Sequence, residues 1–144
     1  MWNYLKDNVV TAIISSVISS FVGLLFTKHS KAVDKKIGDQ NRLLQICSEY
    51  ISQDINLHQD IVLGIYNFRP RGVFDVNSLK QQNRVKVKTY LQAIKDNFEM
   101  NRLLSNLNID NNLISTVEKC LDMDDVYEQL DTVKATLEDI QHKI

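Results

Sequence analysis

Hydrophobic and polar positions divide the chain into two parts with different patterns. Between Asn8 and Thr27 no residue is charged, and eleven of these residues are Val, Ile, Leu or Phe. From residue 39 onward, apolar residues recur every three or four positions, which is typical of helices that bury one face. No segment shows the alternation of a strand. We therefore predict an all-α protein with one N-terminal transmembrane helix, followed by a small cytoplasmic domain of about four helices.

The uncharged segment has the length of a membrane span. A helix of about 20 residues is about 30 Å long, which matches the hydrocarbon core of a bilayer. Its apolar residues favour insertion by a few kcal/mol in sum. The predicted organisation is a transmembrane region at residues 1–30, with the span at 8–27, then a basic linker at 31–38 and a domain at 39–144. Lysines follow the span directly, so the positive-inside rule predicts a short external N-terminus and a cytoplasmic domain.

Two other interpretations fit the first segment less well. A secretory signal peptide, cleaved near Ser30-Lys31-Ala32, has a shorter apolar region and carries its lysines at the other end. A buried helix of a soluble protein is disfavoured because a small domain cannot surround twenty charge-free residues. The membrane span is therefore the prediction.

Small residues form one face of the predicted span. At helical spacing they fall in two adjacent rows, and their members include Ser15, Ser16, Ser19, Ser20 and Gly23. In lipid, close approach of backbones and hydrogen bonds between hydroxyl groups drive helices together. The pattern predicts a homo-oligomeric bundle. The alternative is a lone anchor whose serines bond carbonyl groups one turn earlier in the same helix.

The periodic part predicts four helices. Their approximate ranges are 39–67, 78–105, 112–121 and a last helix that begins at Asp124 or Asp125. Pro70 and Gly72 separate the first two of them. The second carries a narrow apolar stripe of Val87, Leu91, Ile94 and Phe98. The last carries a heptad-like seam of Leu130, Val133, Leu137, Ile140 and Ile144, which is too short to stand alone in water. We expect this seam to pack on another helix of the domain or of a neighbouring subunit.

Residues whose side chains could react or bind a metal form no recognisable active site. Cys47 and Cys120 fall at apolar helix positions, which favours buried reduced thiols over a disulfide. The three histidines have no second metal ligand at helical spacing. The acidic turn at 122–125 lacks the glycine and the closing glutamate of a calcium loop, so it is interpreted as a helix cap. The prediction is a non-enzyme without metal or cofactor.

Charge is distributed unevenly although the formal net charge is only −1. Residues 69–102 contain eight Lys and Arg against three acids, and residues 103–144 contain three lysines against nine acids. Lys80, Arg84 and Lys88 repeat at i, i+4 and i+8, just after Arg69 and Arg71. Like charges at this spacing repel by a few tenths of a kcal/mol. Water, the acidic C-terminal helix or a bound anion can offset that repulsion.

A nucleotide-like ligand is the most specific of these three interpretations. Guanidinium groups pair with phosphate bidentately. Aromatic residues that are near enough in sequence to stack on a base are Phe68, Phe74 and Tyr90. A nearly neutral chain is poorly suited to duplex nucleic acid. In a ring of subunits these cations would gather about one axis, which suits a compact ligand with several negative charges. Anionic lipid headgroups are another candidate, for which the lysines at 28–36 are better placed.

The layout resembles a known class of defence proteins. The span at 8–27 and the basic region from Arg69-Pro70-Arg71 to Lys88 are similar to CRISPR-associated membrane effectors, whose cytoplasmic domain senses cyclic tetra-adenylate made by a type III complex. The resemblance implies a tetramer in the bacterial inner membrane that binds a cyclic oligoadenylate and then disturbs the membrane in antiviral defence. Two alternatives stay open. One is a membrane-tethered adaptor that docks a protein partner through its C-terminal helix, and the other is a toxin-like span that acts without ligand.

Overall fold

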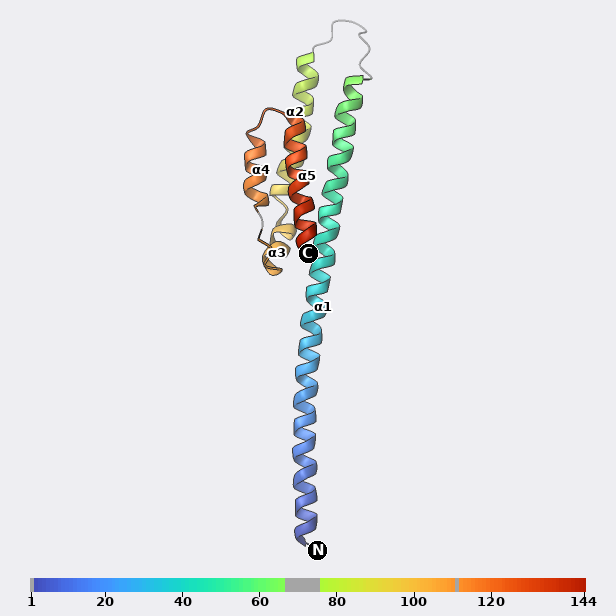
Figure 1. Cartoon of the computed structure of the whole chain (residues 1–144), viewed down its shortest axis with the longest axis vertical. Coiled ribbons are helices and arrows are strands. Elements are labelled where there is room, and N and C mark those ends of the chain that lie inside the picture. Colours follow the sequence, from blue (N-terminus) through green and yellow to red (C-terminus); the bar gives the residue numbers. More distant parts are fainter. Residues whose placement is uncertain (1, 67–75, 111) are drawn as a thin grey trace. The chain divides into compact units, whose positions relative to one another are not determined.

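The computed structural model describes residues 2–66, 76–110 and 112–144, with side chains placed for 15–64, 77–110 and 112–144. In these residues it contains five helices and no strand: α1 (Trp2–Tyr66), α2 (Val76–Lys95), α3 (Phe98–Asn106), α4 (Leu113–Leu121) and α5 (Val126–Lys143), all drawn in Figure 1. The predicted all-α class is confirmed. The chain divides into two compact units, residues 1–38 and 39–144, which are described separately.

The first unit is the N-terminal part of α1. Its large apolar side chains are all between 42% and 71% exposed: Val17, Ile18, Phe21, Val22, Leu24, Leu25, Phe26, Val33 and Ile37. Over the residues that the structure describes, no helix has a stretch that is both long and apolar enough to cross a membrane. The predicted span begins at residue 8, and the side chains of residues 8–14 lie outside the described residues.

The helix predicted to begin near residue 39 is the continuation of α1. Residues 31–38, predicted as a linker, are helical and belong to α1, and no helix begins at residue 39. This segment contains no proline, and its one helix-weakening residue, Gly38, costs only about 1 kcal/mol relative to alanine. Ser30 Oγ also donates to Asp34 Oδ2, one turn later, at 3.5 Å. Local helix propensity therefore allows α1 to continue through residues 31–38.

The second unit has one hydrophobic core to which all five helices contribute. Its buried apolar residues are Leu43, Ile46, Cys47 and Ile61 of α1; Val87, Tyr90, Leu91 and Ile94 of α2; Met100, Leu103 and Leu104 of α3; Leu113, Val117 and Cys120 of α4; and Leu130, Val133, Leu137 and Ile140 of α5. Fully burying one such aliphatic side chain contributes about 1.5–3 kcal/mol. The seam predicted for the last helix is buried inside its own unit at Leu130, Val133, Leu137 and Ile140, whereas its last member, Ile144, is only partly buried. Both cysteines are buried free thiols, as predicted.

The helix predicted at 78–105 is two helices. α2 ends at Lys95, and Asn97 caps α3 by accepting the backbone N–H of Met100 at 2.9 Å. The amide nitrogen of Asn97 donates to the Tyr50 hydroxyl at 2.9 Å, so the residue between α2 and α3 is hydrogen-bonded to α1. The break turns Phe98 outward, where it is 80% exposed. Placing Phe98 in the buried stripe was therefore wrong, because a side-chain cap outweighed the apolar pattern.

In this unit α1 runs antiparallel to both α2 and α5 (Figure 1). Early in this part of α1, the Tyr50 hydroxyl donates to the carbonyl of Ala93, near the end of α2, at 3.1 Å. Near the end of α5, Gln141 Nε2 donates to Ser48 Oγ at 2.9 Å. Further along α1, His58 meets Tyr127 at the beginning of α5, with ring centroids 5.1 Å apart. The end of α1 is thereby brought to the beginnings of α2 and α5.

Candidate functional site

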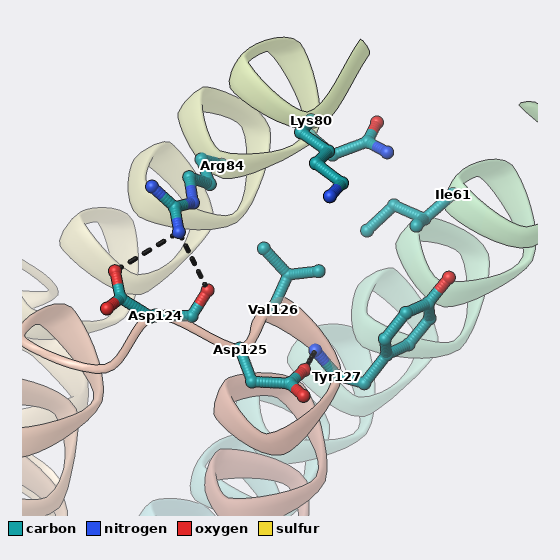
Figure 2. A pocket seen from close by; sticks show the side chains of 8 residues that line it. Ile61, Lys80, Arg84, Asp124, Asp125, Val126 and Tyr127 are labelled. Carbon is teal, nitrogen blue, oxygen red and sulfur yellow. Dashed lines mark hydrogen bonds and ion pairs between the residues drawn. The ribbon is translucent and has the colours of Figure 1, made fainter. Parts of the chain in front are cut away.

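A cleft of about 400 Å³ opens where the beginnings of α2 and α5 meet α1 (Figure 2). Small-molecule sites in proteins usually measure about 300–1,000 Å³. The cleft is lined by Ile61 of α1; Lys80, Asn83 and Arg84 of α2; Asp124 and Asp125 of the turn before α5; and Val126 and Tyr127 of α5. It combines an apolar and aromatic wall with two cations, two carboxylates and a buried amide.

Helical spacing brings Lys80 and Arg84 to the same cleft. They lie one turn apart on α2, and the intervening Asn83 is buried while the two cations are exposed. The Lys80 side chain points into the cleft toward Val126 (Figure 2). Lys80 forms no ion pair within the described part of the chain. Its ammonium group is therefore available for an anionic ligand.

Arg84 has a partner in the turn between α4 and α5. Its Nη2 lies 3.1 Å from Asp124 Oδ1 and 3.4 Å from the Asp124 carbonyl oxygen. The side chains of the two residues are 53% and 95% exposed, respectively. Exposed ion pairs contribute only about 0–1 kcal/mol, so this contact holds Arg84 weakly. The acidic C-terminal helix was predicted as one possible partner for the cationic residues, and the carboxylate that pairs with Arg84 comes from the turn before that helix.

Local hydrogen bonds fix the turn that carries Asp124. The carboxylate of Asp125 caps α5 by accepting the N–H groups of Tyr127 at 2.8 Å and Glu128 at 3.3 Å. The buried amide of Gln129 donates to the carbonyls of Cys120 at 2.7 Å and Met123 at 2.8 Å. These contacts satisfy the open ends of both helices. The Asp125 carboxylate occupies the backbone N–H groups at the N-terminus of α5. An anion in the cleft would therefore bind to side chains and not to these N–H groups.

The cationic residues predicted for one site fall into three groups. Lys80 and Arg84 line the cleft. Lys88 is exposed on α2 but does not line it. Arg69 and Arg71 lie outside the described residues, as do two of the three residues predicted to stack on a base, Phe68 and Phe74.

Tyr90 is not a surface residue, so predicting it as a stacking residue was wrong. Its side chain is only 7% exposed, and its hydroxyl donates to the carbonyl of Tyr50 at 3.0 Å. The rings of Tyr50 and Tyr90 meet edge to face with centroids 6.2 Å apart. The aromatic residue at the cleft is instead Tyr127, which sequence reasoning did not select.

The predicted helix-packing residues lie in the first unit, where Ser15, Ser16, Ser19 and Ser20 are exposed. A side chain added at Gly23 would meet nothing within 4 Å. Thr27 Oγ1 donates to the Gly23 carbonyl at 2.8 Å, which is the local bond expected for a lone anchor. This face is open in the single chain, and its role in a bundle stays a prediction.

Comparison with known proteins finds no family model, no curated protein and no solved structure that matches this chain.

Proposed function

We propose that the protein is a membrane-anchored, self-associating receptor for an anionic nucleotide. In this proposal a span at residues 8–27 lies in the bilayer, and the unit at 39–144 binds a nucleotide second messenger at Lys80 and Arg84. Binding changes the association of the subunits and perturbs the membrane. The resemblance to type III CRISPR membrane effectors supplies the ligand class, a cyclic oligoadenylate, and the role in antiviral defence.

The observation that carries the proposal is the meeting of Lys80 and Arg84 at one cleft. Lys80 has no ion-pair partner within the described residues, and the partner of Arg84 is a carboxylate that is 95% exposed. A phosphate group can pair with a guanidinium through two parallel hydrogen bonds, whereas Arg84 reaches the Asp124 carboxylate through Nη2 alone. On binding, the Asp124 side chain can turn into solvent at little cost.

The rest of the lining suits a base. Ile61 and Val126 are apolar, Tyr127 presents an aromatic ring, and the amide of Asn83 can donate and accept hydrogen bonds. Stacking of a base on an aromatic side chain contributes about 1–3 kcal/mol. A phosphate at the two cations with a base against Tyr127 is therefore a chemically consistent arrangement.

Membrane anchoring rests on the exposed apolar side chains of the first unit. Seven large apolar residues between Val17 and Phe26 are exposed in the single chain, at 42% to 71%. Each apolar residue favours a bilayer by about 0.3–0.6 kcal/mol. Lys28 and Lys31 follow this stretch and suit a cytoplasmic interface. We propose that the serine and glycine face joins copies of the helix, and the resemblance suggests a tetramer.

A ligand can act on such an assembly only through a difference in affinity. It must bind the rearranged state more tightly than the resting state, because equal affinity shifts no population. Neutralising the Lys80 and Arg84 charges, which repel in each subunit and across subunits, is one source of that difference.

The adaptor alternative has less support. Leu130, Val133, Leu137 and Ile140 of α5 are all fully buried in their own unit, so the apolar seam is not free for a partner. Only the acidic outer face of α5 remains for docking. A partner would then be held by exposed charge pairs, which are weak.

Thermal unfolding of the full-length chain in detergent micelles tests the proposal. The panel contains cyclic oligoadenylates, cyclic dinucleotides and inorganic phosphate. At least one nucleotide is expected to raise the melting temperature. Arg84→Glu should weaken its binding about tenfold or more, because a charge-assisted pair is lost. Lys86→Glu makes the same charge change on the same helix away from the cleft, and should stay within about threefold, which corresponds to the worth of one exposed charge.

Two results contradict the proposal. One is the absence of any shift across the panel. The other is an equal loss of binding in Arg84→Glu and Lys86→Glu, which would show that general charge, and not the cleft, attracts the ligand.

A further inference from the structure

Asp54 is an ionisable residue that the fold buries almost completely. It lies on α1 and is 1% exposed. Among the described residues, its Oδ2 is the one buried side-chain nitrogen or oxygen atom that has no hydrogen-bond partner. Leaving such an atom unpaired normally costs about 1–3 kcal/mol, and more when the group is charged. A carboxyl group in this position therefore needs a physical explanation.

The groups around Asp54 do not neutralise it. His58 of α1, Tyr90 of α2, and Lys134 and Asp131 of α5 interact with its carboxyl group. Burial raises the pKa of Asp54 to about 6, and Asp131 acts in the same direction, while Lys134, Tyr90 and His58 act to lower it. Lys134 is not within ion-pair distance of Asp54, and it forms an ion pair with Glu138 instead, at 3.9 Å.

The hydroxyl of Tyr90 indicates which form of Asp54 fits the structure. It lies 3.0 Å from the Tyr50 carbonyl oxygen, which can only accept, so the phenolic proton is donated there. Toward Asp54 the hydroxyl can then offer only a lone pair. An ionised carboxylate, which is the form that Tyr90 favours by lowering the pKa of Asp54, has to compete with the Tyr50 carbonyl for the one phenolic proton. Burial, followed by the charge of Asp54, also raises the pKa of Tyr90, so Tyr90 stays neutral.

We propose that Asp54 is a proton-binding site that controls how firmly α1 is held against α2 and α5. With the proton bound, the buried carboxyl group is neutral, and the Tyr90 hydroxyl keeps its hydrogen bond to the backbone of α1. Without it, a charge is left in the core among three helices. This part of α1 also carries His58, which contacts Tyr127, and Ile61, which lines the cleft. The inference is independent of what the cleft binds.

The direction of the pH effect follows from linkage. The ordinary pKa of Asp54 is 3.8, and in the folded chain it is about 6. Between these values the folded chain binds more protons than the unfolded chain, so the free energy of unfolding falls as the pH rises. The contribution of protonated Asp54 to the free energy of unfolding is complete when the pH is below the ordinary pKa. It is lost once the pH has risen past the pKa of the folded chain. Asp54 therefore loosens the core at neutral pH and tightens it under mildly acidic conditions.

Two measurements on the full-length chain in detergent micelles test this inference. The first is the pH titration of the Asp54 side-chain carboxyl carbon by NMR, which is expected to show a midpoint near 6. The second is the pH dependence of unfolding in the parent chain and in Asp54→Asn, whose amide cannot ionise. Between about pH 5 and about pH 7.5, the unfolding constant of the parent should rise about tenfold more than that of the variant.

Asp60→Asn is the matched control, because Asp60 lies on the same helix and is exposed. Its unfolding should follow that of the parent chain at every pH. A titration midpoint at the ordinary value of an aspartate, or equal pH dependence in the parent and Asp54→Asn, would overturn the inference. The NMR titration requires no variant, so it decides the question even if Asp54→Asn does not fold.

Discussion

Two stretches of α1 contain the same kinds of apolar residue and present them differently. Between Val17 and Phe26 the large apolar side chains are 42% to 71% exposed, whereas Leu43, Ile46, Cys47 and Ile61 are no more than 3% exposed. The first stretch places apolar residues on most sides of the helix. The second places them on one stripe with a spacing of three and four. The stripe is buried within the second unit, and the broad apolar surface is exposed among the described residues of the first unit.

We propose that this difference reflects two different solvents. A one-sided apolar stripe matches a core in water, because the opposite face stays hydrated. A helix that is apolar on most sides is typical of a membrane or of a large core. We propose that lipid and neighbouring copies cover the first stretch.

The largest expected effect comes from placing charge in the first stretch. Two aspartates near the centre of a span cost about 2.5–3.5 kcal/mol each, which exceeds the few kcal/mol that the apolar residues contribute. The double variant Val17→Asp, Phe21→Asp should therefore lose its membrane association. Fractionation of cell membranes, followed by an alkaline carbonate wash, measures this loss.

The control for that experiment adds the same two charges to the second unit. Gln81 and Gln82 are exposed on α2, so Gln81→Asp, Gln82→Asp should leave the protein in the membrane fraction. Equal behaviour of the two double variants would show that the first stretch is not the anchor.

Within the second unit the expected effects are smaller and appear in stability. Leu137 is fully buried on α5, and Leu137→Ala should lower the free energy of unfolding by about 2–5 kcal/mol through lost packing and a cavity. Val85 is 57% exposed on α2, and Val85→Ala should change the free energy of unfolding by about 0.5 kcal/mol or less. Denaturant unfolding of both variants checks the contrast. Similar losses would mean that the core is not packed as described.

The smallest expected effect concerns the cleft. Removing the charge of Asp124 frees Arg84 from an exposed ion pair, which contributes about 0–1 kcal/mol. Asp124→Asn should therefore tighten the binding of an anionic ligand by up to about fivefold. Titration with whichever nucleotide shifts the melting temperature of the parent chain measures this change. Weaker binding in Asp124→Asn would show that Asp124 holds the ligand rather than competing with it.

Sequence patterns predicted the elements that depend on local spacing. The helix predicted at 112–121 is observed at Leu113–Leu121, and the seam of α5 is buried as expected. The predictions failed where a single side chain decided the outcome. Asn97 interrupts an apolar pattern by capping α3, and residues 31–38, predicted as a linker, continue α1. Such outcomes depend on contacts and on small free-energy differences that periodicity does not contain.

The candidate site was only partly predictable for the same reason. Helical spacing was enough to place Lys80 and Arg84 together, since they lie on one helix. Asp124, Tyr127 and Ile61 reach the cleft through the packing of other helices, and no local pattern relates them to Arg84. Tyr90 was misassigned because its spacing did not reveal that Tyr50 covers it. The burial of Asp54 was likewise invisible, because a charged residue within a helix normally lies on the solvated face.

The central claim is that the first unit is held in lipid. The most direct test is to reconstitute the unmodified full-length chain into lipid vesicles, wash them with alkaline carbonate and float them on a density gradient. We predict that the protein rises with the vesicles. Recovery of the protein at the bottom of the gradient, separate from lipid, would contradict the account.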